Sequence, residues 1–256
     1  MARRPRIDIP GYHHIINRGV NKTDIFKVSE DKETFLKIAC KACSIYHATL
    51  HDYCLMDNHY HLLIENQQDN LSLLMRQINA NYAIYFNKKY LRSGHLWQGR
   101  YSSWYIIDDE YLYRTIRYIE HNPIKAKITA EIREYPYTLG SLLLRGEEVP
   151  TCAMDSMMIS QFDTKTLANF LDEALGDDEI KMLETERKKQ IEIKDRQAYR
   201  KEKKALESYF DSSMTREHRN SAIYEAYRDG HTQKSIAKYI GLTDAAVNII
   251  IKKFRI

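Results

Sequence analysis

The spacing of apolar residues predicts a mixed α and β domain at the start of the chain. Short apolar or alternating runs are typical of strands, and apolar residues three or four positions apart are typical of amphipathic helices. The clearest helix spans residues 71–89, where one apolar stripe would face a core. We expect strands at residues 12–17, 48–56, 59–65 and within 94–107, and helices at residues 30–46, 71–89 and 110–122.

This order of elements predicts an α+β fold. A β-α-β-β-α-β-α succession favours an antiparallel sheet with helices on one face, a ferredoxin-like sandwich. We assign this domain to residues 1–148. Residues 149–210, rich in charged side chains, are expected to form a helical connector, and residues 211–256 an all-α domain.

The last domain has the pattern of a helix-turn-helix motif, with Gly241 making the turn between two short helices. In a DNA complex the final helix would enter a major groove and offer Asn248 and Lys252. On the same helix, the acidic Asp244 and the apolar Ile249 would equally suit a protein–protein surface.

Net charge is +4, distributed as +3 over residues 1–150, −2 over 151–210 and +3 over 211–256. Two mildly basic ends suit two nucleic-acid-binding modules, although ordinary scatter also gives +3. No apolar run approaches the ~20 residues of a membrane span, and the start of the chain lacks the apolar stretch of a signal peptide. We therefore expect a cytoplasmic protein with no membrane partner.

The four cysteines do not form a disulfide framework. Cys40 and Cys43 lie in a helix-like stretch, where they would pack as small apolar side chains. Cys54 and Cys152 are isolated in the sequence. We expect a reducing compartment and no cysteine-based metal site.

Candidate chemistry begins with two histidines one residue apart, His59 and His61. Successive strand residues point to opposite faces, so both imidazoles would lie on one face and Tyr60 on the other. Two imidazoles on one face can bind a common metal ion. Taken alone, His-x-His is weak, since most such pairs are surface or core histidines.

A second motif lies on the predicted helix that ends before Pro123, because proline disfavours helical geometry in the residue before it. Arg114, Tyr118 and Asn122 are spaced four apart and would share one face of that helix. A phenol can attack phosphorus, an amide oxygen can reach a metal and an arginine can offset phosphate charge. The set suits cleavage of nucleic acid.

Four motifs occur together in order: GYHHIINRGVNKTDIF, NHYHLLI, GHLWQGRYSSWYI and RYIEHNPIKA. With them the chain resembles the single-tyrosine HUH transposases, in particular the REP-associated tyrosine transposases. The resemblance covers about residues 8–145. It implies a DNA endonuclease and strand transferase that acts on single-stranded or hairpin DNA through a 5′-phosphotyrosine intermediate and releases a 3′-OH.

The resemblance also implies residue roles. Tyr118 would be the nucleophile, and His59, His61 and Asn122 would hold a divalent metal. Neighbouring Tyr111 and Tyr113 compete with Tyr118, but neither has an amide four residues on.

The metal itself is expected to be Mg²⁺ or Mn²⁺, the ions that the family uses. Imidazole nitrogen alone would favour zinc, manganese or iron, but an amide oxygen and phosphate oxygens give a mixed shell. His13 and His14 are candidate auxiliary ligands, and His121 is the alternative to Asn122.

Several basic residues of the first domain are candidate phosphate contacts, although each is also an ordinary surface cation. They are Arg18, Arg100, Arg114, Lys125 and Lys127. The alternative function is a non-catalytic DNA-binding regulator that uses the same fold and the helix-turn-helix. A rolling-circle initiator is less favoured, since the sequence has no G-x-x-x-x-G-K-[ST] loop. The resemblance leaves a homodimer open.

Overall fold

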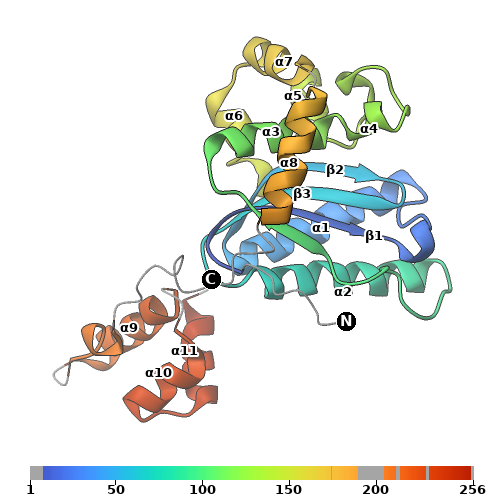
Figure 1. The fold of residues 1–256 in the computed structure, drawn as a ribbon. Helices are drawn as coiled ribbons and strands as arrows, with labels where there is room; N and C mark the ends of the chain where they lie inside the picture. The colour runs from blue at the N-terminus through green and yellow to red at the C-terminus, as the bar shows by residue number, and fades with distance from the viewer. Residues whose placement is uncertain (1–7, 174, 190–204, 212–213, 229–230, 255–256) are drawn as a thin grey trace. The chain divides into compact units, whose positions relative to one another are not determined.

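The structure, a computed structural model, describes residues 8–173, 175–189, 205–211, 214–228 and 231–254 (Figure 1). The chain divides into two compact units, residues 1–194 and residues 195–256, and each is treated by itself. None of the described helices is both long enough and apolar enough to cross a lipid bilayer.

The first unit is built on a four-stranded antiparallel sheet with the order β2-β3-β1-β4. The strands are β1 (Gly11–Arg18), β2 (Ala48–Met56), β3 (His59–Asn66) and β4 (Ser102–Tyr105). β2 and β3 form the expected hairpin, and the backbone oxygen of Asp57 in its turn accepts hydrogen bonds from the Ile25 and Phe26 amides. The predicted α+β class and antiparallel sheet are confirmed, with β4 shorter than expected.

Helices cover both faces of this sheet, so the prediction of helices on one face is wrong (Figure 1). The ring of Phe35 in α1 (Ser29–Tyr46) lies 4.8 Å from that of Tyr60 and 5.2 Å from that of Tyr82 in α2 (Leu71–Lys89). On the other side, Tyr118 in α3 (Asp109–Glu120) lies 5.9 Å from His61. Tyr60 and His61 are consecutive strand residues and point to opposite faces. β2 is buried from Leu50 to Met56, because both of its faces are covered.

The remaining elements of the first unit are short. They are η1 (Val20–Lys22), α4 (Asn122–Lys125), η2 (Ile132–Glu134), α5 (Leu139–Arg145), η3 (Thr151–Ala153), α6 (Met157–Gln161), α7 (Thr164–Asp172) and α8 (Asp177–Lys189). Met158, Leu167, Leu171 and Leu183 are buried in the same core as the sheet. The first part of the predicted connector therefore packs on the first domain, while its residues 190–204 lie outside the described residues.

Cys40 and Cys152 form a disulfide, which corrects the expectation that Cys40 packs as a small apolar side chain and that Cys152 is isolated. Their Cα atoms are 4.8 Å apart although 112 residues separate them in the sequence. The bond ties α1 to η3. Cys43 and Cys54 are buried and free, as small apolar side chains would be.

The second unit contains η4 (Leu206–Ser208) and the three helices α9 (Arg216–Arg228), α10 (Gln233–Ile240) and α11 (Asp244–Lys253). Its core is formed by residues that include Ile223, Ile236, Val247 and Ile251. Thr232 caps α10 by accepting a hydrogen bond from the Ser235 amide. Gly241 ends the helix in the left-handed region, with φ of 69°, where glycine avoids a side-chain clash.

Candidate functional site

His59 and His61 lie on the sheet face that α3 covers, at the end of β3 that follows the hairpin turn. His61 is central, since its backbone pairs with Ile16 of β1 and with Cys54 of β2. The two imidazole centroids are 5.1 Å apart. The structure therefore brings the two predicted ligands together on one face, as the strand period requires.

Hydrogen bonding fixes the protonation of the His59 ring. Its Nδ1 lies 2.6 Å from Oδ1 of Asn58, an amide oxygen that can only accept, so Nδ1 carries the proton and Nε2 keeps its lone pair. Burial, and to a smaller degree the charge of Arg18, lowers the pKa of His59 to about 4. His59 is therefore neutral near pH 7, which is the form that binds metals.

The tyrosine preferred from the sequence lies beside these histidines. The ring of Tyr118 is 5.9 Å from the rings of both His61 and His14, edge-on to each. The ammonium group of Lys125 lies 4.9 Å from the centre of the Tyr118 ring. Thus a phenol from α3, imidazoles from β1 and β3 and a cation from α4 lie close together.

The two competing tyrosines differ from Tyr118 in their surroundings. Tyr111 is fully buried. The Tyr113 hydroxyl donates to Gln161, and its ring contacts Phe162 and Phe170, which directs it toward α6 and α7. The contacts of Tyr113 with α6 and α7 agree with the preference for Tyr118.

Asn122 stands at the junction of α3 and α4. Its Nδ2 donates to the backbone oxygens of Tyr118, at 2.7 Å, and Ile119, at 3.2 Å. Because its nitrogen is held by the helix end, Oδ1 is the atom that it offers to a cation. Its alternative, His121, donates from Nε2 to the Leu171 backbone oxygen at 2.7 Å and so faces α7.

The two auxiliary candidates of β1 separate, as consecutive strand residues must. His13 donates from Nε2 to the Ile9 backbone oxygen on the opposite face, where burial lowers its pKa to about 4. His14 lies on the histidine face, with its Nε2 3.0 Å from Nδ1 of His61. Its ring also lies 5.6 Å from that of the half-buried Trp104, which sequence reasoning did not single out.

The predicted phosphate contacts differ in exposure. Arg18 is exposed beside His59, with which it pairs in the sheet. Arg100, Lys125 and Lys127 are also exposed. The structure corrects the prediction that Arg114 contacts phosphate. Arg114 is buried, its guanidinium is 2.8 Å from the Glu110 carboxylate, and it contacts the sulfur of Met182. It packs α3 against α8 and is not presented to a substrate.

A buried carboxyl pair fixes the end of the tyrosine helix and was also missed from the sequence. Asp52 of β2 and Glu120 of α3 are fully buried and close enough for the charge of Glu120 to raise the pKa of Asp52. The Gly140 amide donates to Oε1 of Glu120 at 2.7 Å. Glu120 thereby anchors α3 to the sheet and to α5, two residues after Tyr118.

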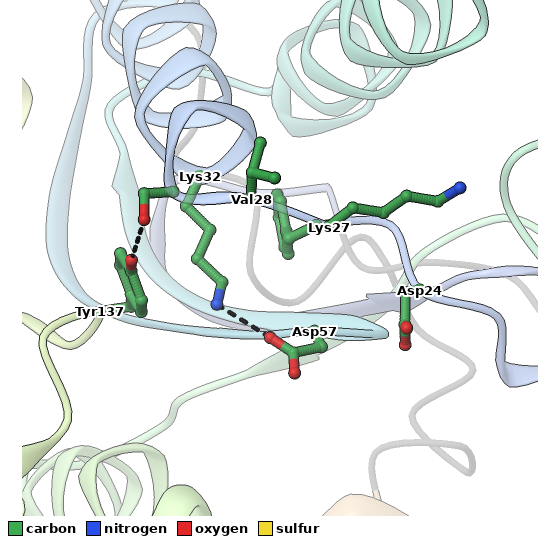
Figure 2. A pocket seen from close by; sticks show the side chains of 8 residues that line it. Asp24, Lys27, Val28, Lys32, Asp57 and Tyr137 are labelled. Atoms are coloured by element: carbon green, nitrogen blue, oxygen red, sulfur yellow. Dashed lines mark hydrogen bonds and ion pairs between the residues drawn. The ribbon is translucent and has the colours of Figure 1, made fainter. Parts of the chain in front are cut away.

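A polar pocket lies near the hairpin turn (Figure 2). Its Lys32 ammonium is 2.9 Å from the Asp57 carboxylate and 4.0 Å from the centre of the Tyr137 ring. Tyr137 in turn donates to Ser29 at 2.8 Å. These groups already pair with one another, so the pocket adds no chemistry to the histidine site.

Within the described ranges, no group of three or more histidine, cysteine, aspartate or glutamate side chains is arranged to hold a metal ion. A cation at the His59–His61 pair would need an amide oxygen, water or a substrate oxygen to complete its shell. That donor set, nitrogen with oxygen, suits Mn²⁺ and accommodates Mg²⁺.

Comparison with known proteins shows similarity to a transposase family over part of the first unit. Residues 10–122 match the family described as "Transposase IS200 like". The matched range begins before β1 and ends at Asn122, so it includes the histidine pair and Tyr118. The resemblance inferred from the four sequence motifs is thereby confirmed for this region.

Two particular proteins are similar to parts of the chain. A Haemophilus influenzae protein named as a REP-associated tyrosine transposase is 29% identical over 97 residues, which cover 33% of this chain and 54% of that protein. This chain thus matches about half the length of that relative. A solved structure of a REP-associated tyrosine transposase bound to a REP hairpin is 18% identical, covers 60% of this chain and 93% of that one, and has a TM-score of 0.47.

Proposed function

We propose that the first unit is a metal-dependent DNA endonuclease and strand transferase that cleaves single-stranded or hairpin DNA with Tyr118. The observation that carries this proposal is the convergence of Tyr118 from α3 with His61 from β3, 5.9 Å apart between ring centroids. A histidine pair beside a tyrosine has a simple structural alternative, which is aromatic packing. The match to IS200-like transposases over this same region favours the chemical reading.

The residues present fit a divalent cation. Nδ1 of His59 donates to the amide oxygen of Asn58, which leaves Nε2 as the nitrogen with a lone pair. Asn122 offers Oδ1, since its nitrogen donates to the end of α3. We propose His59, His61 and Asn122 as the ligands. When bound, the ion would polarise a non-bridging phosphate oxygen and stabilise transition-state charge.

In the proposed reaction the phenolic oxygen of Tyr118 attacks phosphorus and the bond from phosphorus to the 3′ oxygen breaks. The phenol loses its proton and the leaving 3′ oxygen gains one, so a 3′-OH is released and a 5′-phosphotyrosine remains. Attack by a second 3′-OH on that link reverses the step and joins strands without ATP. The ammonium of Lys125 beside the ring would stabilise negative charge on the phenolic oxygen.

The exposed cations around the site are the proposed contacts to the DNA backbone. Arg18 stands beside His59, and Lys125 stands over the nucleophile. Arg100 and Lys127 are exposed in the same unit. Such contacts would position the strand without reading its bases.

For the second unit we propose a helix-turn-helix that binds duplex DNA. The short α10, the Gly241 turn and α11 follow one another as that motif requires. Asn248, partly exposed on α11, is the proposed base contact, and the side chain of Lys252 lies outside the described ones. A regulator that only binds DNA would need this unit and not the histidine site.

The test is a labelled single-stranded hairpin incubated with the full chain and Mn²⁺. We expect a covalent protein–DNA adduct from the wild type and from Tyr113→Phe, and none from Tyr118→Phe. Equal adduct from wild type and Tyr118→Phe would refute the nucleophile. Binding with no cleavage at any metal or hairpin would favour the non-catalytic regulator.

A further inference from the structure

We infer that His14 is a positioning residue that sets the tautomer of His61 and so presents Nε2 of His61 to the cation. This inference rests on the proposed function, because His14 would contact a ligand of the same proposed metal site. A histidine on an adjacent strand would do for His61 what the Asn58 amide oxygen does for His59.

The sheet register brings the two rings together. In β1, Ile16 pairs with His61 and His14 pairs with Leu63, so His14 is the diagonal neighbour of His61 on the same face. The rings stack at 5.3 Å with an interplanar angle of 22°. The two nitrogens, Nε2 of His14 and Nδ1 of His61, are 3.0 Å apart, which is a hydrogen bond.

One proton lies between these two nitrogens, and its position decides what His61 can do. If Nδ1 of His61 donates, Nε2 of the same neutral ring has a lone pair for a metal. If Nε2 of His14 donates instead, a neutral His61 carries its proton on Nε2 and cannot bind a metal there. Metal binding at Nε2 therefore requires His14 to be the acceptor.

The surroundings hold the His14 ring in place. Its side chain is fully buried, and its ring lies against those of Trp104, at 5.6 Å, and Tyr118, at 5.9 Å. Metal-binding histidines usually donate their second ring N–H to a fixed acceptor, and loss of that acceptor costs about 10–100-fold in affinity. His14 would thus touch both the proposed ligand and the proposed nucleophile.

The experiment measures Mn²⁺ affinity of the full chain without DNA, from the electron paramagnetic resonance signal of the free ion. We expect His14→Leu to weaken binding about 10–100-fold. His14→Gln should restore most of it, because the glutamine amide oxygen reaches about as far as Nε2 and can accept the same hydrogen bond. His13→Leu is the matched control: it removes the neighbouring buried imidazole on the opposite face and should leave the affinity unchanged.

His59→Ala and His61→Ala separate the two proposals. If neither alters Mn²⁺ affinity, the metal site of the proposed function fails. If both do and a folded His14→Leu does not, the inference about His14 alone is overturned.

If His14→Leu does not fold, a measurement on the wild-type protein still tests the inference. In ¹H–¹⁵N spectra of the imidazoles with saturating Zn²⁺, a diamagnetic ion that imidazole binds well, we expect a proton on Nδ1 of His61 and metal on Nε2. An Nδ1 without a proton would contradict the inference.

Discussion

Asp52 and Glu120 face each other in the interior, where two charged carboxylates would repel. Burial, and then the charge of Glu120, raises the pKa of Asp52, and burial raises that of Glu120. Oδ1 of Asp52 accepts from the Tyr53 amide. Because the pKa of Asp52 is raised well above its usual value, this acid is the one that stays neutral in the folded chain.

This pair predicts a pH dependence of folding. A carboxyl whose pKa is raised in the folded state contributes stability that is complete below its unfolded pKa, about 4, and is lost as pH rises through the folded pKa. We therefore expect the contribution of this pair to the free energy of unfolding to fall as pH rises above about 4, by about 1.4 kcal/mol for each unit by which the pKa is raised.

Asp52→Asn should flatten that dependence, because the amide can donate to Glu120 at every pH. Urea denaturation across this pH range measures it, with the exposed Asp24→Asn as control. An unchanged slope in Asp52→Asn would show that the pair does not titrate as described.

Gly140 packs against Glu120, so we expect that a side chain at this position is not tolerated. A Cβ at this position would lie 2.7 Å from Cδ of Glu120 and 2.7 Å from Cδ1 of Leu171. We expect Gly140→Ala to cost about 1–3 kcal/mol, as overpacking does, and to slow adduct formation by shifting the end of α3. Thermal unfolding tests this, with Gly99→Ala, which has open space around its Cβ, as the neutral control.

Lys125 and Lys127 offer a matched pair two residues apart. Both are exposed, but Lys125 stands over the Tyr118 ring. We expect Lys125→Gln to lower the single-turnover rate of adduct formation by about tenfold or more, since a cation beside the nucleophile stabilises developing charge. Lys127→Gln should change DNA affinity only. Equal rate losses in the two variants would remove the special role of Lys125.

A substitution of Asn248 tests the proposed DNA binding by the second unit independently of cleavage. If α11 reads a major groove, Asn248→Ala should weaken binding to a cognate duplex by about 1–3 kcal/mol and leave cleavage of a short hairpin unchanged. Fluorescence anisotropy measures the affinity, with the exposed Glu225→Ala of α9 as control. Duplex affinity unaffected by Asn248→Ala would favour the protein–protein surface.

The sequence predicted features that depend on local period and on proline. The hairpin at Asp57 and helix α2 follow from such rules. The end of α3 lies at Glu120, close to the predicted position, but Asn122 before the proline is itself helical, as the first residue of α4. The shared face of His59 and His61 follows from the strand period alone.

Features that depend on packing between distant segments could not be predicted. The Cys40–Cys152 bond joins residues 112 positions apart, and no spacing rule connects them. The contact of His14 with His61 needs the β1–β3 register. Arg114 shares a helix face with Tyr118 by spacing, but Glu110 and Met182 engage its side chain.

The most direct measurement of the central claim is identification of the residue that carries DNA. The wild-type adduct formed on a hairpin with Mn²⁺ is digested with nuclease and protease, and the nucleotide-bearing peptide is sequenced by mass spectrometry. We expect the nucleotide on Tyr118, linked through its 5′ phosphate. A nucleotide on Tyr111, on Tyr113 or on any other side chain would contradict the proposed active site.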